Sequence, residues 1–262
     1  MNIFDLSGRV ALITGGGSGL GRAFCEAMAE YGADVACCDI DLEAAQGTAE
    51  LINKFGSRTL AIKADVSEPV DVDHMVNEVR RELGKLDILF NNAGITTKPA
   101  KTAEITIEDW DRVMTVNLRG VFLCMRTALP IMVKQKRGSI INISSVAGLK
   151  ASDPEVRPHA HYNAAKAGVI MLTKQAAVEY AMHGIRVNCI APGYHRTARG
   201  GKWYAALTDR ERQEEEELTI RRIPMGRGAE PKEIKGMAVY LASDASGFVT
   251  GQVFVQDGGY SV

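Results

Sequence analysis

Two side chains able to exchange protons stand four residues apart in the stretch Tyr162-Asn163-Ala164-Ala165-Lys166. Residues at this spacing return to the same face of a helix, so the Tyr162 phenol and the Lys166 ammonium would be neighbours. A free tyrosine has a pKa near ~10 and is a poor base at neutral pH, but a cation beside it favours the phenolate. The pair therefore predicts a tyrosine that acts as acid or base. The alternative is two ordinary residues on a helix surface.

The helices and strands that would position Tyr162 and Lys166 follow a regular pattern, in which short apolar segments alternate with longer amphipathic ones. We expect strands at residues 10–14, 35–38, 59–63, 86–90, 139–143, 185–190 and 252–255. Helices are expected at about 20–31, 42–55, 70–83, 107–134 (interrupted by Gly120 and Pro130) and 162–183, with another from Thr208. Such an alternation implies right-handed crossovers and a parallel, doubly wound α/β sheet of about seven strands with helices on both faces. No linker or composition break divides the chain, so one domain, 1–262, is expected.

Composition and charge narrow the class of protein. A net charge of -1 over 262 residues argues against a nucleic-acid-binding surface. No signal-like N-terminus is present, and no apolar run approaches the ~18 residues of a membrane span, so we expect a cytoplasmic protein without a membrane partner. Five cysteines in apolar surroundings lack metal-ligand spacing, which predicts buried reduced thiols, a reducing compartment and no metal site: Cys25, Cys37, Cys38, Cys124 and Cys189.

The loop after the first expected strand is rich in glycine and reads Thr14-Gly15-Gly16-Gly17-Ser18-Gly19-Leu20-Gly21. Glycines let the backbone turn sharply and approach a diphosphate closely, while the N-terminus of the following helix faces the anion. The spacing is T-G-x-x-x-G-x-G rather than G-x-G-x-x-G. Four glycines among residues 15–19, directly after a buried strand, favour a dinucleotide site over an ordinary turn.

With these motifs in order, the chain resembles the short-chain dehydrogenase/reductase family nearly end to end. The remaining matching motifs are Asn91-Asn92-Ala93-Gly94, Asn117, Ser144-Ser145, Tyr162 with Lys166, Pro192-Gly193 with Thr197, and Asp257-Gly258-Gly259. The resemblance implies a Rossmann fold, a nicotinamide dinucleotide, and a Ser-Tyr-Lys centre that interconverts an alcohol and a ketone.

The resemblance also implies the catalytic roles. Ser145, rather than Ser144, precedes Val146 in a Ser-Val-x-Gly pattern and would hold the substrate oxygen. Tyr162 would be the general base or acid, and Lys166 would lower the tyrosine pKa and hold the nicotinamide ribose. Asn117 would hold a water that relays protons from Lys166.

Cofactor choice depends on Asp39, which ends the second strand, where this fold places a carboxylate on the adenosine ribose. The carboxylate would repel a 2′-phosphate, which predicts NAD; a turn-capping aspartate is the alternative. By resemblance, Asp65 and Val66 lie near the adenine, Asn91 near its ribose and Thr197 near the carboxamide. The implied cofactor-binding residues are Gly15, Ser18, Gly19, Leu20, Gly21, Asp39, Asp65, Val66, Asn91, Ala93, Gly94, Tyr162, Lys166, Pro192, Gly193 and Thr197.

Two segments depart from the family pattern. The segment before Tyr162 is longer than usual, and its histidines, His159 and His161, are expected to be solvated. Residues 194–223 are expected to form a substrate lid, hinged at Gly200-Gly201 and closed by Trp203 and Tyr204. A basic cluster in it would attract an anionic substrate or is simply surface charge: His195, Arg196, Arg199 and Lys202.

The predicted function is NAD-dependent interconversion of a secondary alcohol and a ketone. A polyol, a sugar acid or a hydroxy acid is the expected class of substrate. A 3-oxoacyl-thioester reductase is the alternative enzyme. A non-catalytic dinucleotide-binding subunit is the alternative of another class, although it would be expected to lack Ser145, Tyr162 or Lys166.

A homo-oligomer, dimer or tetramer, is expected, with surplus apolar residues of the two long helices as partner surface: Val113, Val116, Val121, Leu123, Val169, Met171, Leu172 and Ala176.

Overall fold

Seven parallel strands form one sheet in a computed structural model that describes residues 2–154, 158–197, 204 and 206–262. Their spatial order is β3-β2-β1-β4-β5-β6-β7. The strands are β1 Val10–Thr14, β2 Asp34–Asp39, β3 Thr59–Lys63, β4 Ile88–Asn91, β5 Gly138–Ile143, β6 Ile185–Pro192 and β7 Val253–Gln256. The predicted doubly wound α/β fold is confirmed, and every predicted strand is present within two residues of its expected ends.

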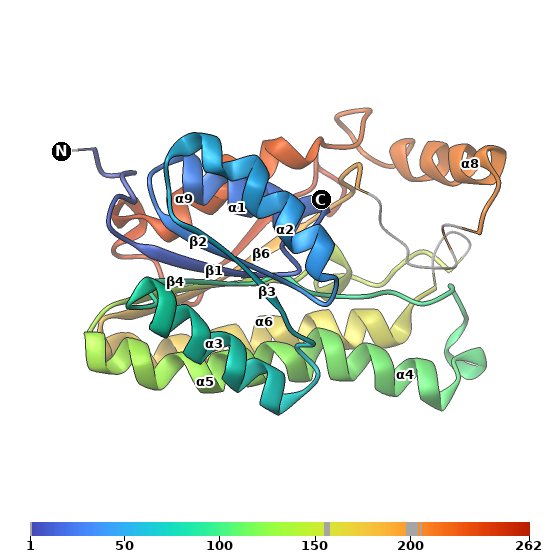
Figure 1. Ribbon diagram of the computed structural model, residues 1–262. Helices are drawn as coiled ribbons and strands as arrows, with labels where there is room; N and C mark the ends of the chain where they lie inside the picture. Colours follow the sequence, from blue (N-terminus) through green and yellow to red (C-terminus); the bar gives the residue numbers. More distant parts are fainter. Residues whose placement is uncertain (1, 155–157, 198–203, 205) are drawn as a thin grey trace.

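Helices cover both faces of this sheet (Figure 1). One face carries α1 Gly19–Glu30, α2 Leu42–Ile52 and α9 Lys235–Ala242. The other carries α3 Pro69–Leu83, α4 Ile107–Met114, α5 Gly120–Gln135 and α6 Ala160–Tyr180, while α8 Asp209–Ile220 stands at the end of the sheet. Because both faces are covered, all five residues of β1 are buried, as expected for a parallel strand.

Two features of the helices differ from the prediction. Gly120 and Pro130 do not interrupt the long helix, because α4, a π-helical turn Thr115–Arg119 and α5 run on without a break and Gly120 keeps a helical φ of -59°. Helix α9 was not predicted. Its residues are apolar on several sides, so no amphipathic period marks it, and it packs into the core beside α1.

The continuous helix Ile107–Gln135 has the length and the mean hydropathy, 1.3, of a membrane span. Half of its most apolar window is buried inside the structure, however. Its buried side chains, such as Leu123 and Met132, pack with α3 and the sheet in one core cluster. The core helix of a globular protein passes the same test, so the helix by itself is weak support for a membrane location.

The five cysteines are buried and unpaired, as predicted. Burial raises the pKa of Cys124 to about 12 and that of Cys189 to about 11, so both stay protonated at neutral pH.

The order of the strands decides where a ligand binds. β1 lies between β2 and β4, so the chain leaves β1 on one side of the sheet and leaves β4 on the other. Loops that diverge in this way open a crevice at the carboxyl ends of the two strands. The glycine loop after β1 and Asn92-Ala93-Gly94 after β4 meet there.

Candidate active site

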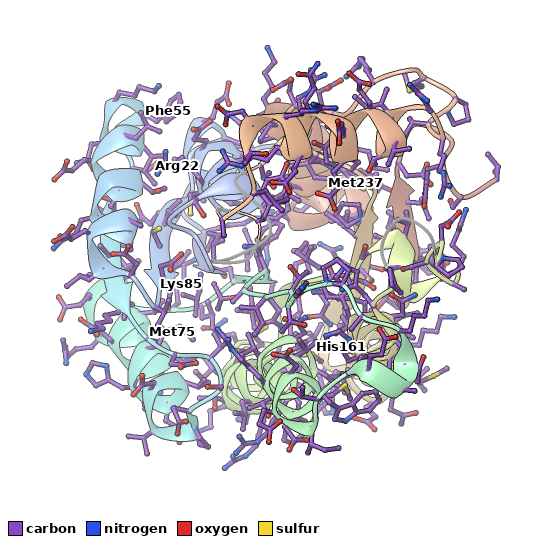
Figure 2. The ribbon with its side chains drawn as sticks, turned by 90° about the vertical axis from the view of Figure 1, so that its right-hand side faces the viewer. Arg22, Phe55, Met75, Lys85, His161 and Met237 are labelled. Atoms are coloured by element: carbon purple, nitrogen blue, oxygen red, sulfur yellow. The ribbon has the colours of Figure 1, made fainter. Side chains whose placement is uncertain are left out.

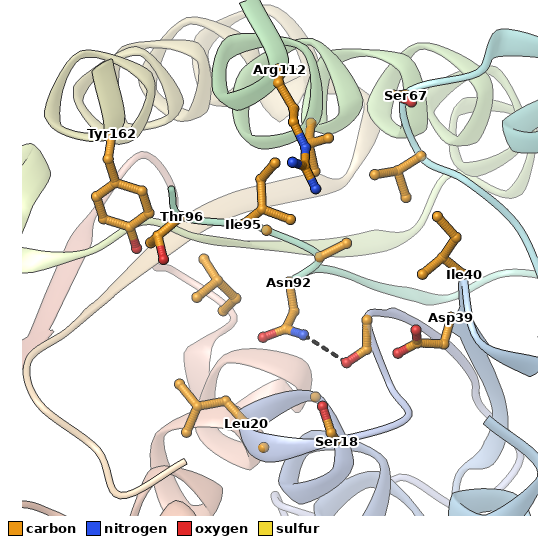
Figure 3. A pocket seen from close by; sticks show the side chains of 18 of the residues that line it. Ser18, Leu20, Asp39, Ile40, Ser67, Asn92, Ile95, Thr96, Arg112 and Tyr162 are labelled. Atoms are coloured by element: carbon orange, nitrogen blue, oxygen red, sulfur yellow. Dashed lines mark hydrogen bonds between the residues drawn. The ribbon is translucent and has the colours of Figure 1, made fainter. Parts of the chain in front are cut away.

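A cavity of about 680 Å³ occupies this crevice (Figure 3). All but three of the predicted cofactor-binding residues line it, the exceptions being Asn91, Pro192 and Gly193. Asp39 stands at one end and Tyr162 at the other, with Asn92 between them.

The glycine loop is held in shape from several sides. Gly15 has a φ of +64°, which favours glycine, and a Cβ at Gly21 would overlap the Gly15 carbonyl oxygen. The Asn92 amide donates to Thr14 O at 2.9 Å and to Gly15 O at 3.1 Å. Ser18, the N-cap of α1, makes no side-chain capping bond, and the first turn of α1 has no acidic residue. The N-terminus of α1 at the cavity wall therefore has the features that favour a bound anion.

The Asp39 carboxylate accepts two backbone hydrogen bonds, from Gly17 N at 2.9 Å and from Asp41 N at 3.1 Å. Asp39 therefore caps this turn, as the alternative interpretation predicts. Asp39 also lines the cavity, and a carboxylate has about four acceptor positions, so it retains capacity for ribose hydroxyls. The turn contacts are therefore compatible with the ribose role, which stays a prediction.

Tyr162 and Lys166 lie side by side in the first turns of α6, with Lys166 Nζ 5.7 Å from the centre of the phenol ring. Both are buried, at 7% and 3% exposure. Lys166 Nζ donates to Ile143 O at 2.8 Å, and Ser144 Oγ donates to Lys166 O at 2.8 Å. These two contacts fix the lysine between the end of β5 and the cavity. Ser144 is thus a support for the helix, more than a simple strand-end hydroxyl.

Ser145 caps the 3₁₀ turn Val146–Gly148 that follows β5. Its Oγ accepts from Ala147 N at 3.2 Å, which orients the oxygen and leaves the hydroxyl proton available to an acceptor. Ser145 is buried and is not among the residues that line the cavity.

Asn117 is fully buried in the π-helical turn, although asparagine within a helix usually faces solvent. Its Oδ1 accepts from Ile95 N at 2.7 Å and its Nδ2 donates to Ile95 O at 2.8 Å. The amide therefore clamps the segment after β4 whose residues Ile95, Thr96, Thr97 and Lys98 wall the cavity.

Known proteins are similar to this chain in sequence and in fold. The family model described as enoyl-(acyl carrier protein) reductase matches residues 15–261. Cyclohexanol dehydrogenase of Acinetobacter sp. (strain SE19) is 39% identical over 97% of this chain and 95% of its own length. The 3-oxoacyl-[acyl-carrier-protein] reductase FabG of Thermotoga maritima is 38% identical over 97% of this chain and 98% of its own. A solved short-chain type dehydrogenase/reductase from Mycobacterium marinum has a TM-score of 0.92 at 38% identity, with 99% and 98% of the two chains covered.

The chain belongs to the short-chain dehydrogenase/reductase family. It is therefore an oxidoreductase that acts on an alcohol/ketone pair with a nicotinamide dinucleotide, NAD or NADP. Its residues fit that cofactor. Besides the glycine cradle, the buried Oγ1 of Thr197, which lines the cavity, has no hydrogen-bond partner among the described residues and is available to a ligand.

Asn91 departs from its expected place in this short-chain dehydrogenase/reductase. Its side chain turns into the core, where Nδ2 donates to Asn142 Oδ1 at 2.7 Å, and Asn142 Nδ2 donates to Thr173 Oγ1 at 2.9 Å. Successive strand side chains point to opposite faces, so at this edge the Asn92 side chain reaches the cavity and that of Asn91 does not. A contact between Asn91 and the ribose would therefore have to come from its backbone, and not from its side chain.

The expectation for His159 and His161 is wrong, because both are buried. His161 lies inside the molecule (Figure 2) with Nε2 2.7 Å from Thr97 Oγ1. Ala100 N donates to Pro158 O at 2.9 Å, so the cavity-wall segment packs against the start of α6. Burial lowers the pKa of His161, and the Asp109 carboxylate only partly opposes this.

The basic cluster is not free to bind an anion as a whole. Arg196 forms ion pairs with Glu216 at 2.9 Å and Glu230 at 3.2 Å, and these hydrogen bonds raise its pKa. His195 is buried beside Gly193 O. The other predicted lid residues, Arg199, Gly200, Gly201, Lys202 and Trp203, lie outside the described residues. The salt-bridged helix expected from Thr208 is present as α8, capped by the Thr208 hydroxyl.

Several cavity residues had no motif to mark them. They are Ile40, Ala64, Ser67, the segment Ile95–Lys98, Asp109, Arg112, Val116 and Ile143. For Arg112 the one signal in the sequence is its place on the helix that leads into Asn117.

Proposed function

We propose that this protein is an NAD-dependent dehydrogenase that interconverts a secondary alcohol and a ketone. One observation carries the proposal: a single cavity has Tyr162 and Lys166 at one end and Asp39 at the other, with the glycine loop along its wall. The spacing of these groups suits a dinucleotide whose nicotinamide lies beside the tyrosine.

The chain's own residues would handle the proton. Tyr162 takes the hydroxyl proton of the alcohol at its phenolic oxygen, and gives it back in the reverse direction. Lys166 is held by Ile143 O and keeps a positive charge beside the phenol. Ser145, oriented by Ala147 N, donates to the substrate oxygen. When bound, the nicotinamide ring supplies the hydride chemistry.

Removal of the phenolic oxygen tests this mechanism. Tyr162→Phe is expected to bind NADH as the wild type does and to lose turnover, by a factor of about 10² or more, because the general acid/base is gone. Tyr180→Phe, at the far end of α6, is the matched control and should leave turnover unchanged. Near-normal turnover by Tyr162→Phe would exclude the mechanism.

The preference for NAD rests on charge. Asp39 would repel a 2′-phosphate, and its neighbour Ile40 carries no charge. The nearby Arg22 does not line the cavity, because it donates to Gly17 O at 2.7 Å and to Thr48 Oγ1 at 3.1 Å. We expect kcat/KM for NAD to exceed that for NADP by at least about tenfold, which corresponds to ~1.4 kcal/mol. Equal use of the two cofactors would contradict the role of Asp39.

For the substrate we propose an uncharged secondary alcohol, since Arg196 is already paired with Glu216 and Glu230. The likeness to a cyclohexanol dehydrogenase favours cyclic alcohols within this class. Assays of NADH formation with cyclic alcohols, polyols, sugar acids and hydroxy acids will rank them. Higher kcat/KM for the sugar acids or hydroxy acids would contradict the proposal.

The second candidate is a 3-oxoacyl-thioester reductase, favoured by the likeness to FabG of Thermotoga maritima. Acetoacetyl-CoA with NADH and with NADPH tests it. Reduction with NADPH at a kcat/KM above that of any alcohol with NAD would replace the first proposal.

We also propose a cytoplasmic homo-oligomer that uses the outer faces of the long helices. Most residues predicted for that surface are buried in the monomer, and Met171 is the clearest exception. The exposed apolar residues on the long helices and the turn after α6 include Ile107 (71%), Phe122 (48%), Met171 (63%), Val178 (80%) and Met182 (94%). A monomer in light scattering at micromolar concentration would contradict the oligomer.

A further inference from the structure

Arg112 places a guanidinium in the cavity, and no carboxylate of the described residues pairs with it. It belongs to the last turn of α4, and its guanidinium extends into the cavity from the wall that faces Ser18 and Leu20 (Figure 3). Within the described residues Arg112 has neither an ion pair nor a hydrogen bond. By contrast, Arg119, two turns later, donates to Ser67 O at 3.1 Å.

Three other charged groups along the cavity are held by hydrogen bonds within the described structure, whereas Lys98 and Asp109, which also line it, are not. Asp39 accepts from Gly17 N and Asp41 N, and Asp65 accepts from Ser67 N at 2.9 Å and Ser67 Oγ at 2.6 Å. Lys166 donates to Ile143 O. Asp109 lines the cavity on the same helix as Arg112, but no ion pair joins the two in the described structure. Arg112 is therefore positioned to receive a negative charge that a ligand brings.

The position of Arg112 along the cavity indicates which group of the ligand would carry this negative charge. Arg112 lies between Tyr162 at one end and Asp39 at the other (Figure 3). In a dinucleotide the diphosphate is the link between the two nucleosides, so it occupies the middle of such a site. The N-terminus of α1 faces the same middle region through Ser18 and Leu20.

We propose that Arg112 binds the dinucleotide diphosphate from the side opposite the α1 N-terminus. This inference rests on the proposed function. A guanidinium presents a planar set of N–H donors that matches the oxygens of a phosphate. The backbone N–H groups of the glycine loop and the Arg112 side chain would then hold the diphosphate from two walls. Because the long side chain is otherwise unpaired, it can open to admit or release the cofactor.

Binding of NADH without turnover tests the proposal. Arg112→Met keeps most of the apolar stem and removes the charge. Its Kd for NADH, measured by calorimetry or by nicotinamide fluorescence in 50 mM salt, should rise about tenfold, and Arg112→Lys should show a smaller rise. The Kd of the variant should also depend less on salt, because one phosphate contact is lost. Arg126→Met, an exposed arginine of α5, is the matched control and should bind like the wild type.

Two competing ligands separate a phosphate contact from a structural effect. ADP carries the diphosphate and adenosine does not, so Arg112→Met should weaken displacement of NADH by ADP and leave displacement by adenosine unchanged. An unchanged Kd for NADH, or equal losses for ADP and adenosine, would overturn the role of Arg112 and leave the proposed function intact. A wild-type protein that bound no NADH would overturn both.

Discussion

Asn117→Ala removes a buried clamp from the wall of the active site. The wild-type amide is fully buried and bonds both backbone groups of Ile95, at 2.7 Å and 2.8 Å. Ile95 itself is only part-buried, but the space that the Asn117 amide vacates is fully buried, so the Ile95 N–H and C=O lose their partners on the side that faces the core. An unsatisfied buried polar group costs ~1–3 kcal/mol, so the two together should cost about 3 kcal/mol. For a chain of this size that lowers Tm by about 6–12 °C.

Gln135 provides a matched control in the same long helix. Its side chain makes the same pair of bonds, accepting from Leu86 N at 3.2 Å and donating to Leu86 O at 2.8 Å. Gln135 is only half-buried and lies outside the cavity, so water can replace its contacts after Gln135→Ala. We expect a cost of ~1 kcal/mol, a fall in Tm of about 2–4 °C, and turnover like that of the wild type.

The two variants should be compared by thermal unfolding, by NADH affinity and by turnover at a temperature where both remain folded. Asn117→Ala should lose turnover beyond what its stability explains, because Ile95 and the residues after it line the cavity. Equal losses of Tm in the two variants would refute the argument from burial. Normal turnover by a folded Asn117→Ala would refute the argument that the clamp shapes the active site.

Two further predictions concern a glycine and a histidine. Gly21→Ala should abolish NADH binding, because the new Cβ meets the Gly15 carbonyl oxygen. Gly47→Ala is the control: it has open space around it in α2, so it should be tolerated and stabilise the fold by ~0.5–1 kcal/mol. Normal NADH affinity in Gly21→Ala would contradict this prediction. Burial holds the pKa of His161 below its usual 6.5, so the folded state binds this proton less readily than the unfolded state. The stability that neutral His161 contributes is therefore present above about pH 6.5 and is lost as the pH falls below that value. Tm should therefore fall more steeply between pH 6.5 and 5 in the wild type than in His161→Gln, and parallel curves would disprove the assignment.

Much of the fold could be predicted from local pattern alone. A parallel strand covered on both faces is largely apolar, so β1 appears in the sequence as the apolar run 10–13 followed by Thr14. The glycine loop is visible for a similar reason, since the close approach of Gly21 to Gly15 excludes any side chain. Tyr162 and Lys166 are neighbours by helix geometry, which depends on their spacing and on nothing distant.

Tertiary contacts decided the rest. His161 is buried because Thr97, 64 residues earlier, supplies its hydrogen bond, and Arg196 is paired because α8 brings Glu216 to it. Arg112 became a site residue only when the sheet order placed α4 across the cavity from the α1 N-terminus. The sequence by itself determined which elements form and which side chains could do chemistry, because periodicity and close packing act on neighbouring residues. The assembled fold decided which polar groups face the cavity and which are already hydrogen-bonded, because their partners come from distant elements.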